Sequence, residues 1–134
     1  GAGFIVPTSS TLAGSRPRRD GLRQPEYGLP GPVPEQARFV QGDIRDEAAL
    51  KVLFGEGHFD VVFHEAAQTQ VSYSLAHPRE DAELNVLGLI NVLEQCRRQG
   101  VQKFIYSSSA AVYGDNPKVP LDESEPLAPA SFYA

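Results

Sequence analysis

An α/β fold with a parallel sheet is the fold class that this sequence predicts, on three observations. Short stretches rich in β-forming residues recur near positions 38–41, 58–63 and 102–107. Helical patterns lie between them, near 46–54 and 79–99. Each strand stretch runs into small or polar residues, and open α/β sheets bind their ligands at such strand ends. Because strands and helices alternate over short loops, right-handed crossovers should make all three strands parallel.

The composition fits one globular domain and excludes several classes of function. A chain of 134 residues with 41% hydrophobic and 22% charged residues is ordinary for a single core. The net charge of −5 argues against nucleic-acid binding, which needs a basic face. The sequence has no apolar run long enough for a membrane span, and three scattered histidines with one cysteine predict no metal site. Cys96 lies on an apolar helix face, so we expect it to pack in the core. Because a single cysteine cannot form an internal disulfide, we expect a cytoplasmic protein.

The strand near residues 38–41 closes on Gly42-Asp43-Ile44 and precedes a helix. Either Asp43 or Asp46 could cap this helix, because a carboxylate accepts hydrogen bonds from the free N–H groups of a first turn. Gly55 is expected to end it. The residues predicted to be buried on this helix are Ala49, Leu50, Leu53 and Phe54.

The next two strands end in candidate site residues. One runs from Phe59 to His64 and continues into Glu65-Ala66-Ala67-Gln68. His64 has no second ligand or nucleophile at a suitable spacing, so a structural histidine with satisfied hydrogen bonds is favoured over a catalytic one. The other strand, Phe104 to Tyr106, has the pattern of a buried parallel strand and continues into Ser107-Ser108-Ser109. Three serines in a solvated turn are the alternative to a site at this position.

The clearest helical pattern runs from Pro78 to Gln99. Pro78 suits a first turn, acidic residues follow it, and two arginines precede Gly100, which should end the helix. Gly88 inside the helix costs roughly 1 kcal/mol, which indicates close approach to a strand. The apolar stripe predicted to pack on the sheet consists of Ala82, Val86, Leu89, Ile90, Leu93 and Cys96.

The N-terminal quarter is atypical. Gly1-Ala-Gly-Phe-Ile5 has the composition of a phosphate-binding turn, whose backbone N–H groups approach a pyrophosphate. Residues 6–34 contain 6 of the 11 prolines and show no helical or strand periodicity. A disordered linker is one explanation. Another is frame-shifted coding over roughly residues 6–32, because Arg16 to Gly28 read one base later can be written GHDVTVFDNLSTG, a strand ending in aspartate.

Five motifs follow one another along the chain: Gly1-Ala-Gly-Phe-Ile5, Gly42-Asp-Ile44, His64-Glu-Ala-Ala-Gln68, Ser107-Ser-Ser-Ala-Ala-Val-Tyr-Gly114 and Ser131-Phe-Tyr133. As a set they resemble the extended short-chain dehydrogenase/reductase family, in its branch of NAD-dependent nucleotide-sugar epimerases and dehydratases. The resemblance implies a Rossmann-like, doubly wound parallel sheet. We expect residues 1–134 to form a partial NAD-binding domain, with the first strand and the C-terminal substrate domain absent.

The resemblance also assigns the cofactor, NAD, and the residues that contact it. The ribose-binding acid cannot be assigned, since neither Asp20 nor Glu26 follows a strand-like run, and the choice of NAD over NADP is inferred from the family alone. Asp43 would accept a hydrogen bond from the adenine amino group, with capping of the next helix as its alternative role. Asn85 would be a polar group near the cofactor that satisfies backbone hydrogen bonds, with plain solvent exposure as an equal alternative. The full set of predicted contacts is Gly1, Gly3, Phe4, Ile5, Asp43, Ile44, Ala66, Ala67, Gln68, Asn85 and Ser107.

The same resemblance implies that Ser109 and Tyr133, which are 24 positions apart, are the catalytic residues. Tyr133 would act as the general base toward the sugar 4-hydroxyl, and Ser109 would hydrogen-bond that hydroxyl. Dehydratases of the family carry an Asp-Glu pair at the places of Ala110 and Ala111, which cannot move protons. The implied function is therefore a nucleotide-sugar 4-epimerase that forms a homodimer when full-length. The alternatives are a catalytically silent nucleotide-binding module, or a decarboxylase or reductase of the same family.

Overall fold

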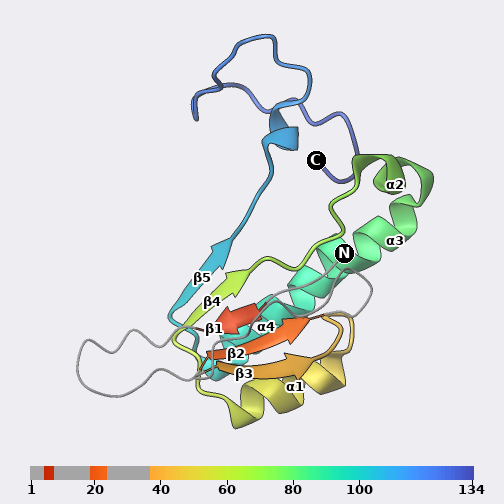
Figure 1. Ribbon diagram of the computed structural model, residues 1–134. Helices are drawn as coiled ribbons and strands as arrows, with labels where there is room; N and C mark the ends of the chain where they lie inside the picture. The colour runs from red at the N-terminus through yellow and green to blue at the C-terminus, as the bar shows by residue number, and fades with distance from the viewer. Residues whose placement is uncertain (1–4, 8–18, 24–36) are drawn as a thin grey trace.

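The computed structural model describes residues 5–7, 19–23 and 37–134, which form one sheet with helices packed against it (Figure 1). The strand order is β3-β2-β1-β4-β5. The strands are β1 (Ile5–Pro7), β2 (Arg19–Arg23), β3 (Ala37–Gln41), β4 (Val61–His64) and β5 (Lys103–Tyr106). Strand β4 pairs with β5 in parallel, and β2 pairs with β3 in parallel. The prediction of parallel strands in an α/β fold is confirmed.

The centre of the sheet differs from the prediction. Residues 6–34 show no strand periodicity in the sequence, yet β2 lies within them, and β1 lies between β2 and β4 and is antiparallel to both. Without a strand in this position, the facing backbone N–H and C=O groups of its neighbours would lack partners inside the sheet. Ile5 and Val6 are β-formers, and three residues suffice to pair with Val62 to His64.

Helix α1 (Glu47–Glu56) follows β3 and begins at an aspartate cap. The Asp46 side chain accepts a hydrogen bond from the Ala49 N–H at 3.0 Å, so Asp46 rather than Asp43 caps the helix. Leu50, Leu53 and Phe54 are buried as predicted. The helix ends at Gly57, not at Gly55, so its predicted end was two residues early.

The long helix predicted from Pro78 is present, but one segment of it is not α-helical. It consists of α3 (Pro78–Ala82), the π-helical turn η2 (Glu83–Leu87) and α4 (Gly88–Gln99). Pro78 occupies the first turn, and Gly100 ends the helix in the left-handed conformation, as predicted. A short helix that the sequence did not predict, α2 (Val71–Ala76), precedes it.

The buried face of this long helix is not the predicted apolar stripe. Val86, Ile90 and Leu93 are exposed, and Ala82 is exposed as well. Apolar side chains often remain on the surface, so an apolar stripe alone does not identify the packed face. Relative to the predicted stripe, the face that packs inward is shifted by about one residue along the sequence, and it carries two polar side chains. It consists of Asp81, Leu84, Gly88, Val92, Gln95 and Cys96.

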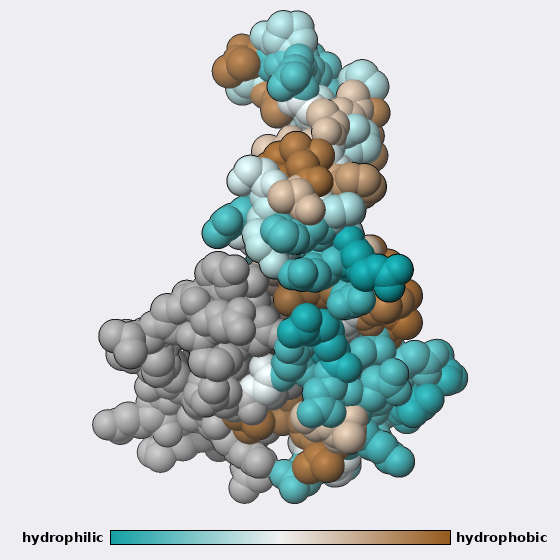
Figure 2. Space-filling model, turned by 90° about the vertical axis from the view of Figure 1, so that its right-hand side faces the viewer, coloured by the Kyte–Doolittle hydropathy of each residue, from teal (hydrophilic) through white to brown (hydrophobic). Residues whose placement is uncertain are grey.

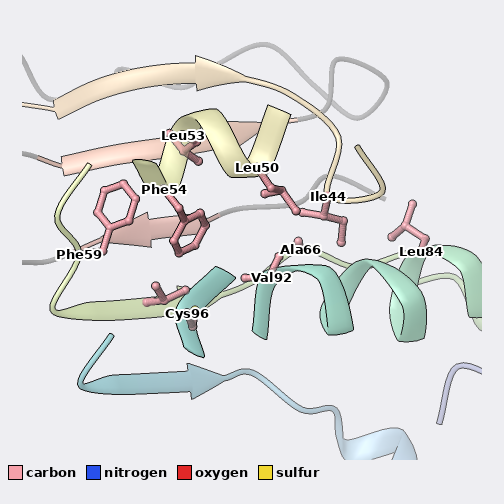
Figure 3. Packing of buried hydrophobic residues seen from close by; sticks show 10 residues of the cluster. Ile44, Leu50, Leu53, Phe54, Phe59, Ala66, Leu84, Val92 and Cys96 are labelled. Carbon is pink, nitrogen blue, oxygen red and sulfur yellow. The ribbon is translucent and has the colours of Figure 1, made fainter. Parts of the chain in front are cut away.

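The hydrophobic core lies between α1, α4 and the sheet (Figure 3). Phe54 and Phe59 meet edge to face with ring centroids 5.1 Å apart. Cys96 is buried here, and burial raises the pKa of its thiol to about 11, which confirms a packing role. Gly88 meets Ile44 in the loop after β3, whereas the sequence predicted approach to a strand.

Strand β5 is an edge strand, and the chain beyond it extends away from the sheet (Figure 1). The prediction that β5 is buried was wrong, because its pattern is half-buried and Tyr106 is exposed. Figure 2 shows the projecting segment as the narrow upper part of the molecule, with hydrophobic and hydrophilic residues interspersed. None of the helices in the described part of the chain is long and apolar enough to cross a membrane.

Candidate functional site

The carboxyl ends of three strands lie at one edge of the sheet. Strands β2, β3, β4 and β5 all point the same way, because β1 is antiparallel to both β2 and β4. The chain therefore leaves β3, β4 and β5 at the same edge, which we call the carboxyl edge. Segments 42–46, 65–70 and 107–109 begin there. This edge brings together the predicted site residues Asp43, Ile44, Ala66, Ala67, Gln68, Ser107 and Ser109.

Strands β4 and β5 are joined at this edge by a side-chain hydrogen bond. The Ser107 hydroxyl donates to the Glu65 carboxylate at 2.6 Å, and the Ser107 N–H donates to the His64 carbonyl at 3.3 Å. The serine turn is thereby fixed next to the loop that follows β4. Glu65 was read in the sequence only as part of a turn, and no spacing signal distinguished it.

Ser109 begins the short 3₁₀ helix η3 (Ala110–Tyr113). Its hydroxyl oxygen accepts a hydrogen bond from the Ala111 N–H at 3.2 Å, which orients the side chain and leaves the hydroxyl proton available for donation. Tyr133 lies in the C-terminal segment, which is held near η3 where the Ala128 N–H donates to the Val112 carbonyl at 2.9 Å. Among the described residues, Ser109 and Tyr133 do not hydrogen-bond one another directly.

The loop after β4 is docked onto the π-helical turn by Asn85. The Asn85 amide oxygen accepts from the Gln68 N–H at 2.8 Å, and its NH₂ group donates to the Gln68 carbonyl at 3.0 Å. This two-point pairing reproduces a piece of sheet hydrogen bonding with a side chain. Ala66 and Gln68 are buried, and Ala67 is half-buried. Asn85 thus holds the predicted cofactor loop in place and is not a solvent-exposed helix residue.

The loop after β3 is docked in a similar way, by Asn91. The NH₂ group of Asn91 donates to the Ile44 carbonyl at 3.2 Å. Ile44 is only 2% exposed and packs into the core. The Asp43 carboxylate accepts hydrogen bonds from the backbone N–H and the guanidinium of Arg45, at 2.6 to 3.1 Å. The predicted adenine contacts of Asp43 and Ile44 remain predictions.

His64 at the end of β4 is buried between aromatic rings. Its ring lies 5.7 Å from that of Phe104 and 5.9 Å from that of Tyr106, centroid to centroid. Burial lowers the pKa of His64, with Glu65 acting in the opposite direction, so the imidazole is neutral at pH 7. The predicted structural role fits this burial. One part of that prediction fails, since Nδ1 has no hydrogen-bond partner among the described residues.

The remaining predicted contacts come from the N-terminus. Gly1, Gly3 and Phe4 lie outside the described residues, as does most of the stretch assigned to frame-shifted coding. Ile5 is the first residue of β1 and pairs with His64 at the carboxyl edge. The described residues contain no group of three or more side chains suited to a metal ion.

One residue at this site has a role that the sequence did not indicate. Asp81 is one of the acidic residues expected in the first turn of the helix, and it stands there, but it is also buried and accepts hydrogen bonds from both Gln68 and Asn85. Its spacing of four residues from Asn85 places the two on one helix face. That spacing could have indicated a shared role.

Comparison with known proteins identifies relatives of this chain. The profile of the family described as GDP-mannose 4,6 dehydratase matches residues 22–134. A UDP-glucose 4-epimerase of Streptomyces lividans is 40% identical over 107 residues, which cover 79% of this chain. UDP-glucuronate 4-epimerase 3 of Arabidopsis thaliana is 42% identical over 97 residues, which cover 71% of it. The chain spans only 32% and 23% of the length of these relatives.

Solved structures give the same result. The NAD complex of UDP-glucose 4-epimerase from Thermus thermophilus is similar with a TM-score of 0.70 and 38% identity, over 75% of this chain and 33% of that one. The UDP-Glc/GlcNAc 4-epimerase from Campylobacter jejuni is similar with a TM-score of 0.69 and 35% identity, over 74% and 30%. The match therefore extends to the three-dimensional arrangement over 75% and 74% of this chain.

Proposed function

Since this chain belongs to the NAD-dependent epimerase/dehydratase family, we propose that it supplies the cofactor side of a nucleotide-sugar 4-epimerase of the UDP-glucose/UDP-galactose type. Bound NAD would provide a hydride acceptor for carbon 4 of the sugar. The observation that carries the proposal is the shared position of the Ser109 turn and the loop 65–70 at the carboxyl edge. Ligands of open α/β sheets bind at this edge.

The residues at the carboxyl edge fit a dinucleotide. Ala67 is half-buried and carries only a methyl group, so a larger side chain there would take up volume that a cofactor needs, whereas the methyl group of Ala66 packs in the core. Asn85 fixes the main chain at Gln68, which keeps that surface in one conformation. A binding surface that is already ordered costs less entropy when the ligand binds.

The two hydroxyl side chains would then handle the proton of the sugar 4-hydroxyl. Tyr133 as phenolate accepts that proton, and Ser109 hydrogen-bonds the same oxygen. The pKa of an isolated tyrosine is about 10, so Tyr133 needs nearby positive charge to act at neutral pH. A lysine four positions beyond the tyrosine, the pattern implied by the resemblance, would provide this charge together with the nicotinamide ring.

Epimerisation is favoured over dehydration by Ala110 and Ala111, which form the start of η3. A dehydratase needs a further acid and base to remove water from the sugar, and two methyl side chains cannot move a proton. An epimerase needs only the Ser109 and Tyr133 pair, because the hydride returns to the opposite face of the same carbon.

The proposal is tested in a chimera in which residues 37–134 replace the matching segment of a UDP-glucose 4-epimerase. We expect turnover of UDP-galactose, a loss of at least about 100-fold with Tyr133→Phe, and unchanged NAD binding in that variant. Tyr106→Phe is the matched control, since Tyr106 is exposed on β5 and has no proposed role in proton transfer. Full turnover by Tyr133→Phe would refute the acid/base assignment. NAD binding without any turnover by the parent chimera would instead favour a silent nucleotide-binding module.

The sugar and the assembly are tested with the same chimera. Relatives with similar identity carry the names UDP-glucose and UDP-glucuronate 4-epimerase, so both nucleotide sugars are to be assayed. The family resemblance also implies a homodimer, and the exposed apolar side chains of the long helix agree with a covered face there. Sedimentation equilibrium would show a dimer if this expectation is correct.

A further inference from the structure

Asp81 in α3 is a carboxylate buried without a cationic partner. Its side chain is 3% exposed, and it takes part in no ion pair within the described part of the chain. Aspartate is rarely buried unless a charge or several hydrogen bonds compensate for lost hydration. Nothing in the proposed chemistry uses this carboxylate, so its burial needs another explanation.

A single oxygen of Asp81 joins the two side chains that hold the loop 66–70. Asp81 Oδ1 accepts from Gln68 Nε2 at 2.8 Å and from Asn85 Nδ2 at 3.1 Å. Gln68 Nε2 also donates to the Gln70 carbonyl at 3.0 Å, and the Gln70 N–H donates back to Gln68 Oε1. Asp81, Gln68 and Asn85 therefore form one connected cluster, which we call the amide cluster.

Asp81 and the backbone of the loop 66–70 agree on the orientation of both amides in the cluster. An amide side chain has nearly the same shape after its oxygen and nitrogen exchange places, so its partners decide which way it points. A carboxylate only accepts, so both NH₂ groups must turn toward Asp81. The Asn85 oxygen then faces the Gln68 N–H, and the Gln68 oxygen faces the Gln70 N–H. Reversal of either amide would bring an NH₂ group against a backbone N–H.

We propose that Asp81 is a positioning residue whose Oδ1 atom anchors the side chains of Gln68 and Asn85 to α3 and, together with the backbone groups that these amides also bind, holds the loop 66–70 in place. The relevance to catalysis rests on the proposed function, under which this loop lies against the cofactor. Both hydrogen bonds end on one oxygen, so the cluster requires an acceptor at that position and does not require a negative charge. Asparagine can supply this oxygen, whereas leucine, of similar size, cannot.

The test is amide hydrogen exchange on the full chain without NAD, with NMR as the measurement. We expect Asp81→Leu to reduce the protection of the Gln68 and Gln70 backbone N–H groups by at least about tenfold, since it removes two acceptor interactions. Asp81→Asn should keep most of that protection. The N–H of Val92 in α4 serves as the reference for global stability and should change less in both variants. Asp115→Leu, at an exposed aspartate outside the helix, is the matched control and should leave all three groups unchanged.

Two results would overturn the proposal. One is unchanged protection of Gln68 and Gln70 in Asp81→Leu, and the other is equal loss in Asp81→Leu and Asp81→Asn, which would mean that the charge is required. If Asp81→Leu does not fold, the parent chain still decides. The side-chain NH₂ groups of Gln68 and Asn85 should exchange more slowly than that of the exposed Gln99, and equal rates would refute the cluster. These measurements use no cofactor, so failure of the proposed function leaves their outcome readable.

Discussion

Gly88→Ala is expected to destabilise the protein, although alanine is the better helix former. A Cβ atom built at Gly88 would lie 2.6 Å from Ile44 Cδ1 and 2.7 Å from Ile44 Cγ1. Carbon atoms in contact are separated by about 3.5 to 4.0 Å, so the overlap is about 1 Å. Rotation of the terminal methyl of Ile44 would relieve the first contact but not the second. The rest of Ile44 is held, because its side chain is 2% exposed and its carbonyl accepts from Asn91.

The magnitude follows from two opposing contributions to the free energy of unfolding. Replacing a helical glycine with alanine gains about 1 kcal/mol. Adding a methyl group to a packed core costs about 1 to 3 kcal/mol, and the upper half of that range applies where the neighbour cannot move. We therefore expect a net loss of about 1 to 2 kcal/mol.

Urea unfolding followed by circular dichroism measures this loss, with Gly55→Ala as the matched control. Gly55 also lies in a helix, and a Cβ built there meets no atom within 4 Å, so its replacement should stabilise the chain by up to about 1 kcal/mol. Ile44→Val removes Cδ1 and should reduce the cost of Gly88→Ala in a double-mutant cycle. If Gly88→Ala stabilised the chain as much as Gly55→Ala, the close packing of α4 on the loop after β3 would be refuted.

Two further predictions concern the helix cap and the buried histidine. Asp46→Ala should lower the free energy of unfolding by about 1 kcal/mol, because the Ala49 N–H loses its acceptor, and Asp46→Asn should lose less in the same urea assay. His64 has a folded-state pKa below its unfolded value of about 6.5, so the unfolded chain binds more protons as the pH falls through that value, and stability should decrease from pH 7.5 to pH 5.5. His64→Phe should remove part of this dependence, whereas replacement of the exposed His58 should retain it; equal behaviour of the two variants would contradict the assignment.

Local chemistry in the sequence predicted much of the fold. Pro78 and Gly100 marked the ends of the long helix because each acts through its own backbone conformation. Such local effects do not depend on tertiary contacts. The strands around Val40, Val62 and Phe104 were found because β-forming residues ended in turns. Their common direction followed from the alternation with helices, and the structure has it. Strand β4 pairs with β5 in parallel, and β3 points the same way but pairs with β2.

The parts that sequence reasoning missed depend on long-range contacts. The buried face of the long helix was misassigned because Asp81 in α3 and Gln95 in α4 lie inward while apolar Ile90 lies outward. The three-dimensional partners of Asp81 explain its inward position. The pairing of Asn85 with Gln68 spans 17 positions, and that of Asn91 with Ile44 spans 47. The sequence predicted that Asn85 satisfies backbone groups, but nothing in it states which loop Asn85 or Asn91 will hold.

The direction of β1 leads to a last prediction, that the chain as printed binds NAD weakly. In a dinucleotide-binding sheet the first strand is parallel to its neighbours, so the turn and helix after it place free N–H groups at the pyrophosphate. Here β1 begins beside His64 at the carboxyl edge and ends with Pro7 beside Val62, so the chain leaves it toward the opposite edge. A helix that followed β1 would therefore start away from the cofactor.

Calorimetric titration with NAD tests this prediction. The chain is compared with a version whose first 36 residues are replaced by an ordinary strand, glycine turn, helix and strand. Comparable micromolar affinity in both would show that the antiparallel β1 is compatible with cofactor binding and that its direction does not matter.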